Sequence, residues 1–210
     1  KVSICVFCEG ESEQAYIDFL KSEFHDVAVF KRPSSPGLFD DADNRFKKDP
    51  GYRNYVDAID EIWFFFDVEE KDIGNWTNRL EIIKRLRKLR KDPKIRVRLL
   101  MTTGCIEYWL MLHYRHLAPS LLTVPDKERM LAQVVNMEPT YRKGNYDATA
   151  RIAQNYPTAV KNATIVLQNL LQEGMPGLED TDERNRWLCT KCKTFSTVQE
   201  AIVFLEGLQS

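Results

Sequence analysis

Acidic side chains follow two apolar stretches of the chain, at the point where each stretch ends. Residues 2–8 lead into Glu9, and residues 62–66 lead into Asp67 and Glu69. A short apolar run that is closed by a turn is typical of a buried strand. Mg²⁺ prefers hard oxygen ligands and uses carboxylates together with water and substrate phosphate. Glu9, Asp67 and Glu69 are therefore predicted to hold Mg²⁺ or Mn²⁺; the alternative is that they are solvated turn residues.

The same acids suggest roles in hydrolysis. Glu9 is predicted to complete the metal cage or to act as a general base on water. Glu107 lies in the first turn of an aromatic, apolar helix, which makes it a candidate fourth acid; the plain alternative is that it favours the helix dipole. His113 in that helix is a candidate proton carrier, with a core or capping position as the alternative. The predicted catalytic residues are Glu9, Asp67, Glu69, Glu107 and His113.

Basic side chains gather in two places. Residues 84–98 carry many Lys and Arg side chains that suit a sugar-phosphate backbone, although a solvated helix face is the usual explanation. Residues 141–146 interleave aromatic and basic side chains, as in sites for phosphate contact and base stacking, with an ordinary surface loop as the alternative. The predicted nucleic-acid-binding residues are Tyr141, Lys143, Arg87 and Arg90.

The composition leaves the partner open. The chain has 210 residues, of which 43% are hydrophobic and 29% charged, and its net charge is -1. The segregation of acidic and basic segments nevertheless favours a polyanion. No run is long and apolar enough to span a bilayer and no signal-peptide pattern is seen, so a cytoplasmic location is expected. The lack of a glycine-rich phosphate loop argues against a nucleotide-dependent enzyme.

Five cysteines are spread along the chain, an odd number that favours a reduced setting. Two Cys-x-x-Cys pairs, Cys5/Cys8 and Cys189/Cys192, have a spacing that would suit a four-cysteine zinc site. Residues three apart in a strand point to opposite faces, however. Buried core thiols are therefore the preferred interpretation for Cys5 and Cys8.

Strand and helix patterns alternate through the first half of the chain. Strands are predicted at residues 2–8, 27–30, 62–66 and 95–102, and helices at residues 12–24, 38–48, 75–91 and 106–114. This alternation predicts an α/β fold with a mostly parallel sheet, in which ligands bind at the carboxyl ends of the strands. Later helices are predicted at residues 126–135, 147–154, 158–172 and 198–208. We predict an α/β core over residues 1–115 and a mainly helical extension packed on it over residues 116–210.

Several of these motifs resemble those of known families. Residues 8–13 (Cys-Glu-Gly-Glu-Ser-Glu) ahead of a helix, and residues 66–69 (Phe-Asp-Val-Glu) after a strand, resemble the TOPRIM fold. More narrowly, residues 103–114 (Thr-Gly-Cys-Ile-Glu-Tyr-Trp-Leu-Met-Leu-His-Tyr) resemble the CFExWLLLHF signature of RloB-like proteins. Further RloB-like elements are matched in the same order by residues 141–143, 159–167 and 197–208. The resemblance covers nearly the whole chain.

The resemblance implies a TOPRIM-like fold and a metal-dependent nuclease of bacterial antiviral defence, similar to effectors that cleave tRNA anticodon loops. Glu9, Asp67 and Glu69 carry over as catalytic and metal-binding positions. Further family positions, to which the resemblance assigns no single role, are Glu13, Glu107, His113, Tyr141 and Lys143. Glu69 stands where the usual DxD motif has its second Asp, and Val68 where the family often has Arg.

Two cleavage routes and two functions stay open at this point. Cleavage would use a metal-activated water, or the 2′-hydroxyl of the RNA with the acids and His113 as proton carriers. The alternative function is a catalytically inactive TOPRIM-like module that binds nucleic acid or regulates a defence system. The expected partners are RNA, above all tRNA, and a defence-system protein, with a homodimer as a further option.

Overall fold

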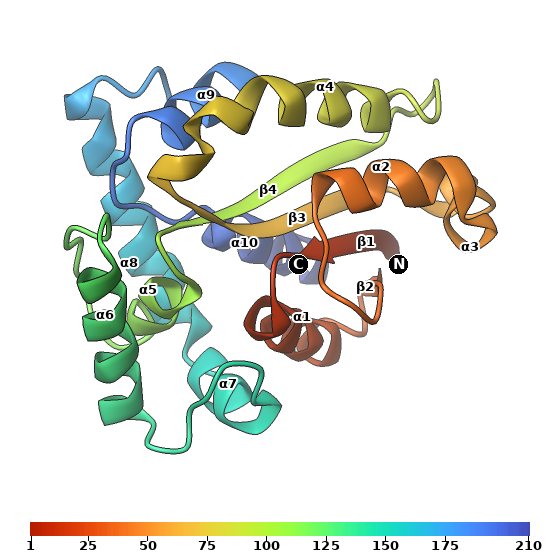
Figure 1. The fold of residues 1–210 in the computed structure, drawn as a ribbon. Helices are drawn as coiled ribbons and strands as arrows, with labels where there is room; N and C mark the ends of the chain where they lie inside the picture. Colours follow the sequence, from red (N-terminus) through yellow and green to blue (C-terminus); the bar gives the residue numbers. More distant parts are fainter.

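A four-stranded sheet lies at the centre of the computed structural model, which describes residues 1–210 (Figure 1). Its strands are β1 (Val2–Cys8), β2 (Ala28–Lys31), β3 (Glu61–Val68) and β4 (Arg96–Thr103). They lie in the order β2-β1-β3-β4, and every neighbouring pair is parallel. The predicted α/β class is confirmed, and the arrangement is consistent with a TOPRIM-like, Rossmann-type fold.

Helices connect the strands and make up most of the second half of the chain. The first half contains α1 (Glu11–Glu23), α2 (Phe39–Lys48), α3 (Pro50–Arg53), α4 (Trp76–Arg87) and α5 (Ile106–Met111). The second half contains α6 (Val124–Met137), α7 (Tyr146–Ala153), α8 (Tyr156–Asn169), α9 (Asp182–Thr190) and α10 (Val198–Gln209). Three 3₁₀ turns are η1 (Val56–Ala58), η2 (Glu70–Asn75) and η3 (Leu170–Glu173). None of the helices combines the length and the apolar character needed to cross a membrane.

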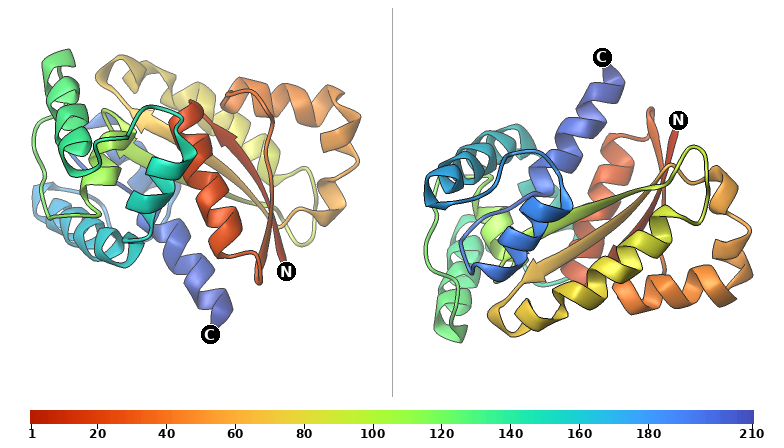
Figure 2. Two further views of the ribbon diagram at one scale, coloured as in Figure 1. Left: turned by 90° about the horizontal axis from the view of Figure 1, so that it is seen from below. Right: turned by 90° about the horizontal axis from the view of Figure 1, so that it is seen from above.

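The two faces of the sheet carry separate hydrophobic cores. Ile4 and Phe65 belong to one core, which also takes side chains of α1, α5 and α10. Phe7 and Phe64 belong to the other, which takes side chains of α2, α4 and α9. Figures 1 and 2 show these helices on the two sides of the sheet. Because successive strand residues point to opposite faces, strands covered on both sides are apolar over most of their length, as β1 and the middle of β3 are.

The second half of the chain also covers the outer edge of β4. Ser196 forms an antiparallel bridge with Thr102. Thr197 donates a backbone hydrogen bond to the carbonyl of Met101 at 2.8 Å, and Thr103 donates one to the carbonyl of Phe195 at 3.0 Å. The sequence did not predict this edge segment, because three residues are too few to show a strand pattern. It shields β4 from pairing with another chain, as edge strands require.

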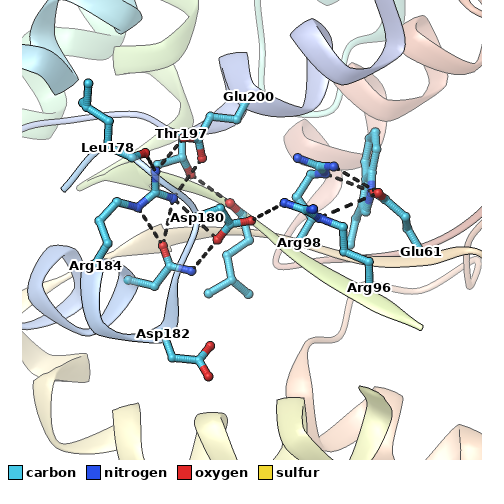
Figure 3. Close-up of polar contacts among 12 residues, drawn as sticks. Glu61, Arg96, Arg98, Leu178, Asp180, Asp182, Arg184, Thr197 and Glu200 are labelled. Atoms are coloured by element: carbon cyan, nitrogen blue, oxygen red, sulfur yellow. Dashed lines mark hydrogen bonds and ion pairs between the residues drawn. The ribbon is translucent and has the colours of Figure 1, made fainter. Parts of the chain in front are cut away.

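The buried charged side chains at the amino end of β3 and beside β4 are paired with charges of opposite sign (Figure 3). Glu61 accepts hydrogen bonds from Arg98 Nε and Nη2, each at 3.0 Å, and from Trp63 Nε1 at 2.5 Å. Arg184, which is 1% exposed, donates to both carboxylate oxygens of Glu200 at 2.6 and 2.9 Å. Burial of these charges is tolerated because each has a bonded partner of opposite sign.

The structure rules out the zinc alternative. All five cysteines are free. Cys8 belongs to the core on the α1 face and Cys5 to the core on the α4 face, so the expectation that they point to opposite faces is confirmed. Cys189 joins the second core, where its thiol bonds the sulfur of Met101 at 3.5 Å. No cysteine takes part in a cluster with metal-ligand spacing.

Candidate metal centre

The carboxyl ends of β1 and β3 lie at different levels. Cys8, the last residue of β1, pairs with Phe65, whereas β3 continues to Val68. Beyond the end of β1, the amide of Asp67 donates a hydrogen bond to Glu9 Oε2 at 3.0 Å. A side-chain acceptor thus replaces the missing strand carbonyl. This stagger holds the Glu9 carboxylate against the backbone of Asp67.

The first turn of α1 adds a third acid. Glu13 is the third residue of this helix and is only 4% exposed. One oxygen each from Glu9, Glu13 and Asp67 lies within 4.8 Å of the others. Gly10, between β1 and α1, leaves room for this approach, because a Cβ there would lie 3.1 Å from Glu13 Oε2. These three residues are called the carboxylate triad below.

The triad is short of positive charge. Burial holds the pKa of Asp67 well above its usual range, and the charges of Glu13 and Glu9 raise it further. Burial also raises the pKa of Glu13 to about 7, with Glu9 and Glu107 adding to the rise and Lys143 opposing it. Carboxylates that raise one another's pKa in this way are stabilised when a cation binds between them.

Glu107 and Lys143 lie beside the triad. Glu107 is the second residue of α5 and is 1% exposed; its Oε1 accepts a hydrogen bond from Lys143 Nζ at 2.6 Å. Burial lowers the pKa of Lys143, but the bond to Glu107 outweighs this effect and the net change is upward. Lys143 therefore carries its positive charge at neutral pH.

The triad has the chemistry of a divalent-cation site. Asp67 Oδ1 is buried and has no hydrogen-bond partner, and neither has Glu107 Oε2. A buried carboxylate oxygen without a donor is costly unless a ligand compensates it. Three carboxylates on two strand ends and one helix offer only hard oxygen donors, which suits Mg²⁺ or Mn²⁺ and not a soft metal.

Glu69 lies outside this cluster, although the sequence analysis placed it among the metal ligands. It follows the end of β3 and pairs with Lys71 Nζ at 3.1 Å and with Lys127 Nζ. Burial opposes ionisation of Glu69, but these two bonds outweigh it and lower its pKa. The charge of Glu69 is thus compensated by two lysines. Glu13, and not Glu69, supplies the third carboxylate of the cluster.

A family model for RloB-like proteins matches residues 4–202. The chain belongs to the RloB-like family. The match runs from β1 into α10, and it therefore includes the triad, Glu107 and Lys143. A search of curated proteins finds no match.

Two predicted site residues of this RloB-like chain lie in its interior. His113 is 2% exposed and bonds Tyr16 Oη at 2.8 Å and the carbonyl of Trp109 at 2.9 Å. Burial lowers its pKa to about 4, so the ring is neutral and both nitrogens are occupied. Tyr141 is 3% exposed, and its ring packs in the core on the α1 face. The structure gives neither side chain access to a bound strand.

Arg87 and Arg90 are separated from the triad. Arg87 pairs with Asp182 of α9, with Nη2 2.7 Å from the carboxylate. Arg90 donates to the carbonyl oxygens of Val56 and Asp57, which precede the amino end of β3. Because α4 runs back along the parallel sheet, its basic end reaches the edge opposite the triad. The helical pattern of residues 75–91 could not show which end of α4 faces the site.

Sequence reasoning placed Glu9 and Asp67 at one edge, and the structure brings them together. It did not include Glu13 among the catalytic or metal residues. One feature of the sequence could have indicated Glu13. It lies in the first turn of a helix that begins shortly after Glu9, the acid at the end of the first strand. Lys71 and Lys127 were also missed, because a single lysine in a loop or helix carries no pattern.

Proposed function

We propose that this protein is a divalent-metal-dependent nuclease that cleaves RNA, with tRNA as the first substrate to test, in bacterial antiviral defence. One observation carries the catalytic part: the unpartnered, buried Asp67 Oδ1 within a triad of carboxylates. Structural acids are paired, as Glu61 is with Arg98. An acid left unpaired at the carboxyl edge of a parallel sheet, where such folds bind ligands, supports a catalytic role.

The triad residues would hold the ion. When bound, a divalent ion polarises a scissile phosphate and acidifies a coordinated water. Asp67 would offer the ion an unpartnered carboxylate oxygen, while the hydrogen bond from the Asp67 amide keeps Glu9 in place. Glu13 is held on α1, so that strand and helix position the ligands rigidly.

RNA as the substrate rests on membership of the RloB-like family and on the charges that surround the triad. Lys71 and Lys127 pair with Glu69, Lys143 pairs with Glu107, and Arg142 precedes Lys143 in the same loop. Lys71 and Arg142 are exposed, so they can contact phosphate oxygens as strand-binding residues do. These residues replace Arg87 and Arg90 as the proposed backbone contacts.

The test is incubation of the protein with total tRNA, other RNA and plasmid DNA, in Mg²⁺, Mn²⁺ or EDTA. Wild type is expected to cut RNA only with the divalent ion, and Asp67→Asn and Glu13→Gln are expected to lose at least about 100-fold in rate. Glu70→Gln, which removes an exposed carboxylate after β3, is the matched control and should cut normally. Identical, uncut profiles for wild type and Asp67→Asn would reject the nuclease.

Two further arms separate the alternatives. A tRNA with a 2′-deoxy residue at the cleaved position should still be cut if water is the nucleophile, and should resist if the 2′-hydroxyl is. RNA binding without cleavage by folded wild-type protein would instead support the regulatory module. Protection of bacteria from phage by wild type but not by Asp67→Asn would support the defence role.

A further inference from the structure

A lysine ammonium is bonded to the buried acid next to the triad. We propose that Lys143 acts as a built-in cation in the place that a second divalent ion would take, so that each chain binds a single divalent ion. This inference rests on the proposed metal centre and specifies its composition. It makes Lys143 a positioning residue for the acidic site.

The first step concerns Glu107. It is 1% exposed, and only one of its two carboxylate oxygens is bonded, by Lys143 Nζ at 2.6 Å. Its charge acts on both Glu13 and Asp67 and raises the pKa of each. A buried carboxylate so close to other acids needs a counter-charge, because removing one partner of such a pair leaves an uncompensated charge. Lys143 is the bonded counter-charge.

The second step concerns how Lys143 is held. Its side chain is 62% exposed, so burial alone does not direct it. The loop around it is fixed instead. The amide of Gly144 donates to Ser12 Oγ at 3.1 Å, and Asn145 caps α7 by accepting from the amide of Ala148 at 2.9 Å.

Gly144 allows the close seating of this loop. It has a φ of 81°, in the left-handed region that favours glycine, and a Cβ there would lie 2.9 Å from Glu11 Oε2. Because Glu11 and Ser12 belong to α1, the helix that carries Glu13 also anchors the loop that carries Lys143. The ammonium and the triad are therefore positioned by one helix.

The third step is the balance of charge. When Glu9, Glu13, Asp67 and Glu107 are all ionised around a bound ion, they carry four negative charges, and a single divalent ion leaves two of these charges uncompensated. Lys143 compensates one of them and, unlike a metal ion, cannot dissociate from the chain. Without Lys143, Glu107 and the acids near it would have the oxygen ligands and the charge of a second divalent-ion site.

The test counts ions in the absence of RNA. Mn²⁺ binding is measured by isothermal titration calorimetry and by the loss of the free-ion signal in electron paramagnetic resonance. Wild type is expected to bind one ion per chain. Lys143→Met is expected to bind two, and Lys143→Arg, which keeps the charge, one. The double variant Glu107→Gln with Lys143→Met removes both partners and is expected to return to one.

Some outcomes would count against the proposal. Two ions in wild type, or one ion in a folded Lys143→Met protein, would overturn it. If Lys143→Met does not fold, as judged by circular dichroism, the wild-type and Lys143→Arg counts still decide. If wild type binds two ions and cleaves RNA, the single-ion inference is wrong and the proposed nuclease activity stands. If wild type binds one ion and does not cleave RNA, the nuclease activity is wrong and the single-ion inference stands. No bound ion in wild type would reject this inference and the metal centre beneath it.

Discussion

The two ends of β3 carry acids with buried carboxylate oxygens, and these acids have opposite surroundings. At the amino end, Glu61 has both oxygens bonded, to Arg98 and Trp63. Near the carboxyl end, Asp67 has an oxygen without any partner, and its nearest charged neighbours, Glu9 and Glu13, are also acids. Both acids sit on one strand of one sheet, so the difference arises from their surroundings and not from the strand.

This contrast separates a structural acid from a candidate functional one. A closed pair such as Glu61–Arg98 offsets its own desolvation and leaves no capacity for a ligand. The carboxylate triad can still bind a ligand, because its charges are not paired within the protein. This lowers the stability of the fold until a cation binds. Unpaired charge near a sheet edge is therefore more informative about function than the number of acids there.

Breaking the closed pair is expected to have the largest effect. Arg98→Met leaves the buried Glu61 with one neutral donor, Trp63, and with the longer ion pair to Arg96 at 3.9 Å. The free energy of unfolding should therefore fall by about 3 kcal/mol, the lower end of the range for breaking a buried pair. Urea unfolding measures this. Arg98→Met combined with Glu61→Leu removes both charges and should recover part of the loss. An unchanged urea midpoint for Arg98→Met would show that the Glu61–Arg98 pair does not stabilise the fold.

His113 is a third buried titratable group. Its lowered pKa determines the direction in which the free energy of unfolding changes with pH. Its pKa falls from 6.5 to about 4 on folding, so the unfolded chain takes up a proton first as the pH drops. This contribution to stability is complete above pH 6.5 and is lost as the pH falls through 4, by about 3 kcal/mol in all. His113→Gln should flatten the slope of unfolding free energy between pH 7 and 4.

The exposed His25 provides the control for that experiment. His25→Gln should keep the slope of wild type. If His113→Gln and wild type show the same slope, His113 is accessible to protons in the folded state, and a role in proton transfer returns.

Stabilisation by a metal ion should depend on the carboxylate triad and not on Glu69. At an Mg²⁺ concentration of 100 times Kd, wild type should gain about 2.7 kcal/mol of stability. Glu13→Gln should remove most of this gain, because it removes a triad ligand. Glu69→Gln should keep it, because Glu69 pairs with Lys71 and Lys127. Thermal unfolding with and without Mg²⁺ measures both, and the reverse pattern would assign the ion to Glu69.

The smallest expected effect is a gain in stability. In EDTA, Asp67→Asn removes a carboxyl group whose ionisation is disfavoured by burial and by the neighbouring acids, and it should raise the free energy of unfolding by about 1–2 kcal/mol, the range of single stabilising substitutions. The same variant should gain nothing from Mg²⁺. Glu70→Gln, an exposed neighbour, should change neither value. A destabilised Asp67→Asn in EDTA would mean that Asp67 is a structural acid like Glu61.

Local patterns were sufficient to predict the strands and most helices. The apolar runs of β1, β3 and β4 are long and buried on both faces, so they are visible in the sequence. α9 was not predicted, because its sequence is mostly polar and it is held by contacts such as Arg184 with Glu200. The edge segment next to β4 was missed for a related reason, since its three residues are defined by their partner strand.

By itself, the sequence determined that Glu9 and Asp67 would meet. Parallel strands align their carboxyl ends, and a residue that follows an apolar run must then lie at that edge. Only the tertiary structure decided the rest of the site. It replaced Glu69 with Glu13, directed Lys143 to Glu107, buried His113 and turned Arg87 away. These outcomes depend on helix orientation and on which distant charges become neighbours, and spacing along the chain does not encode distances in space.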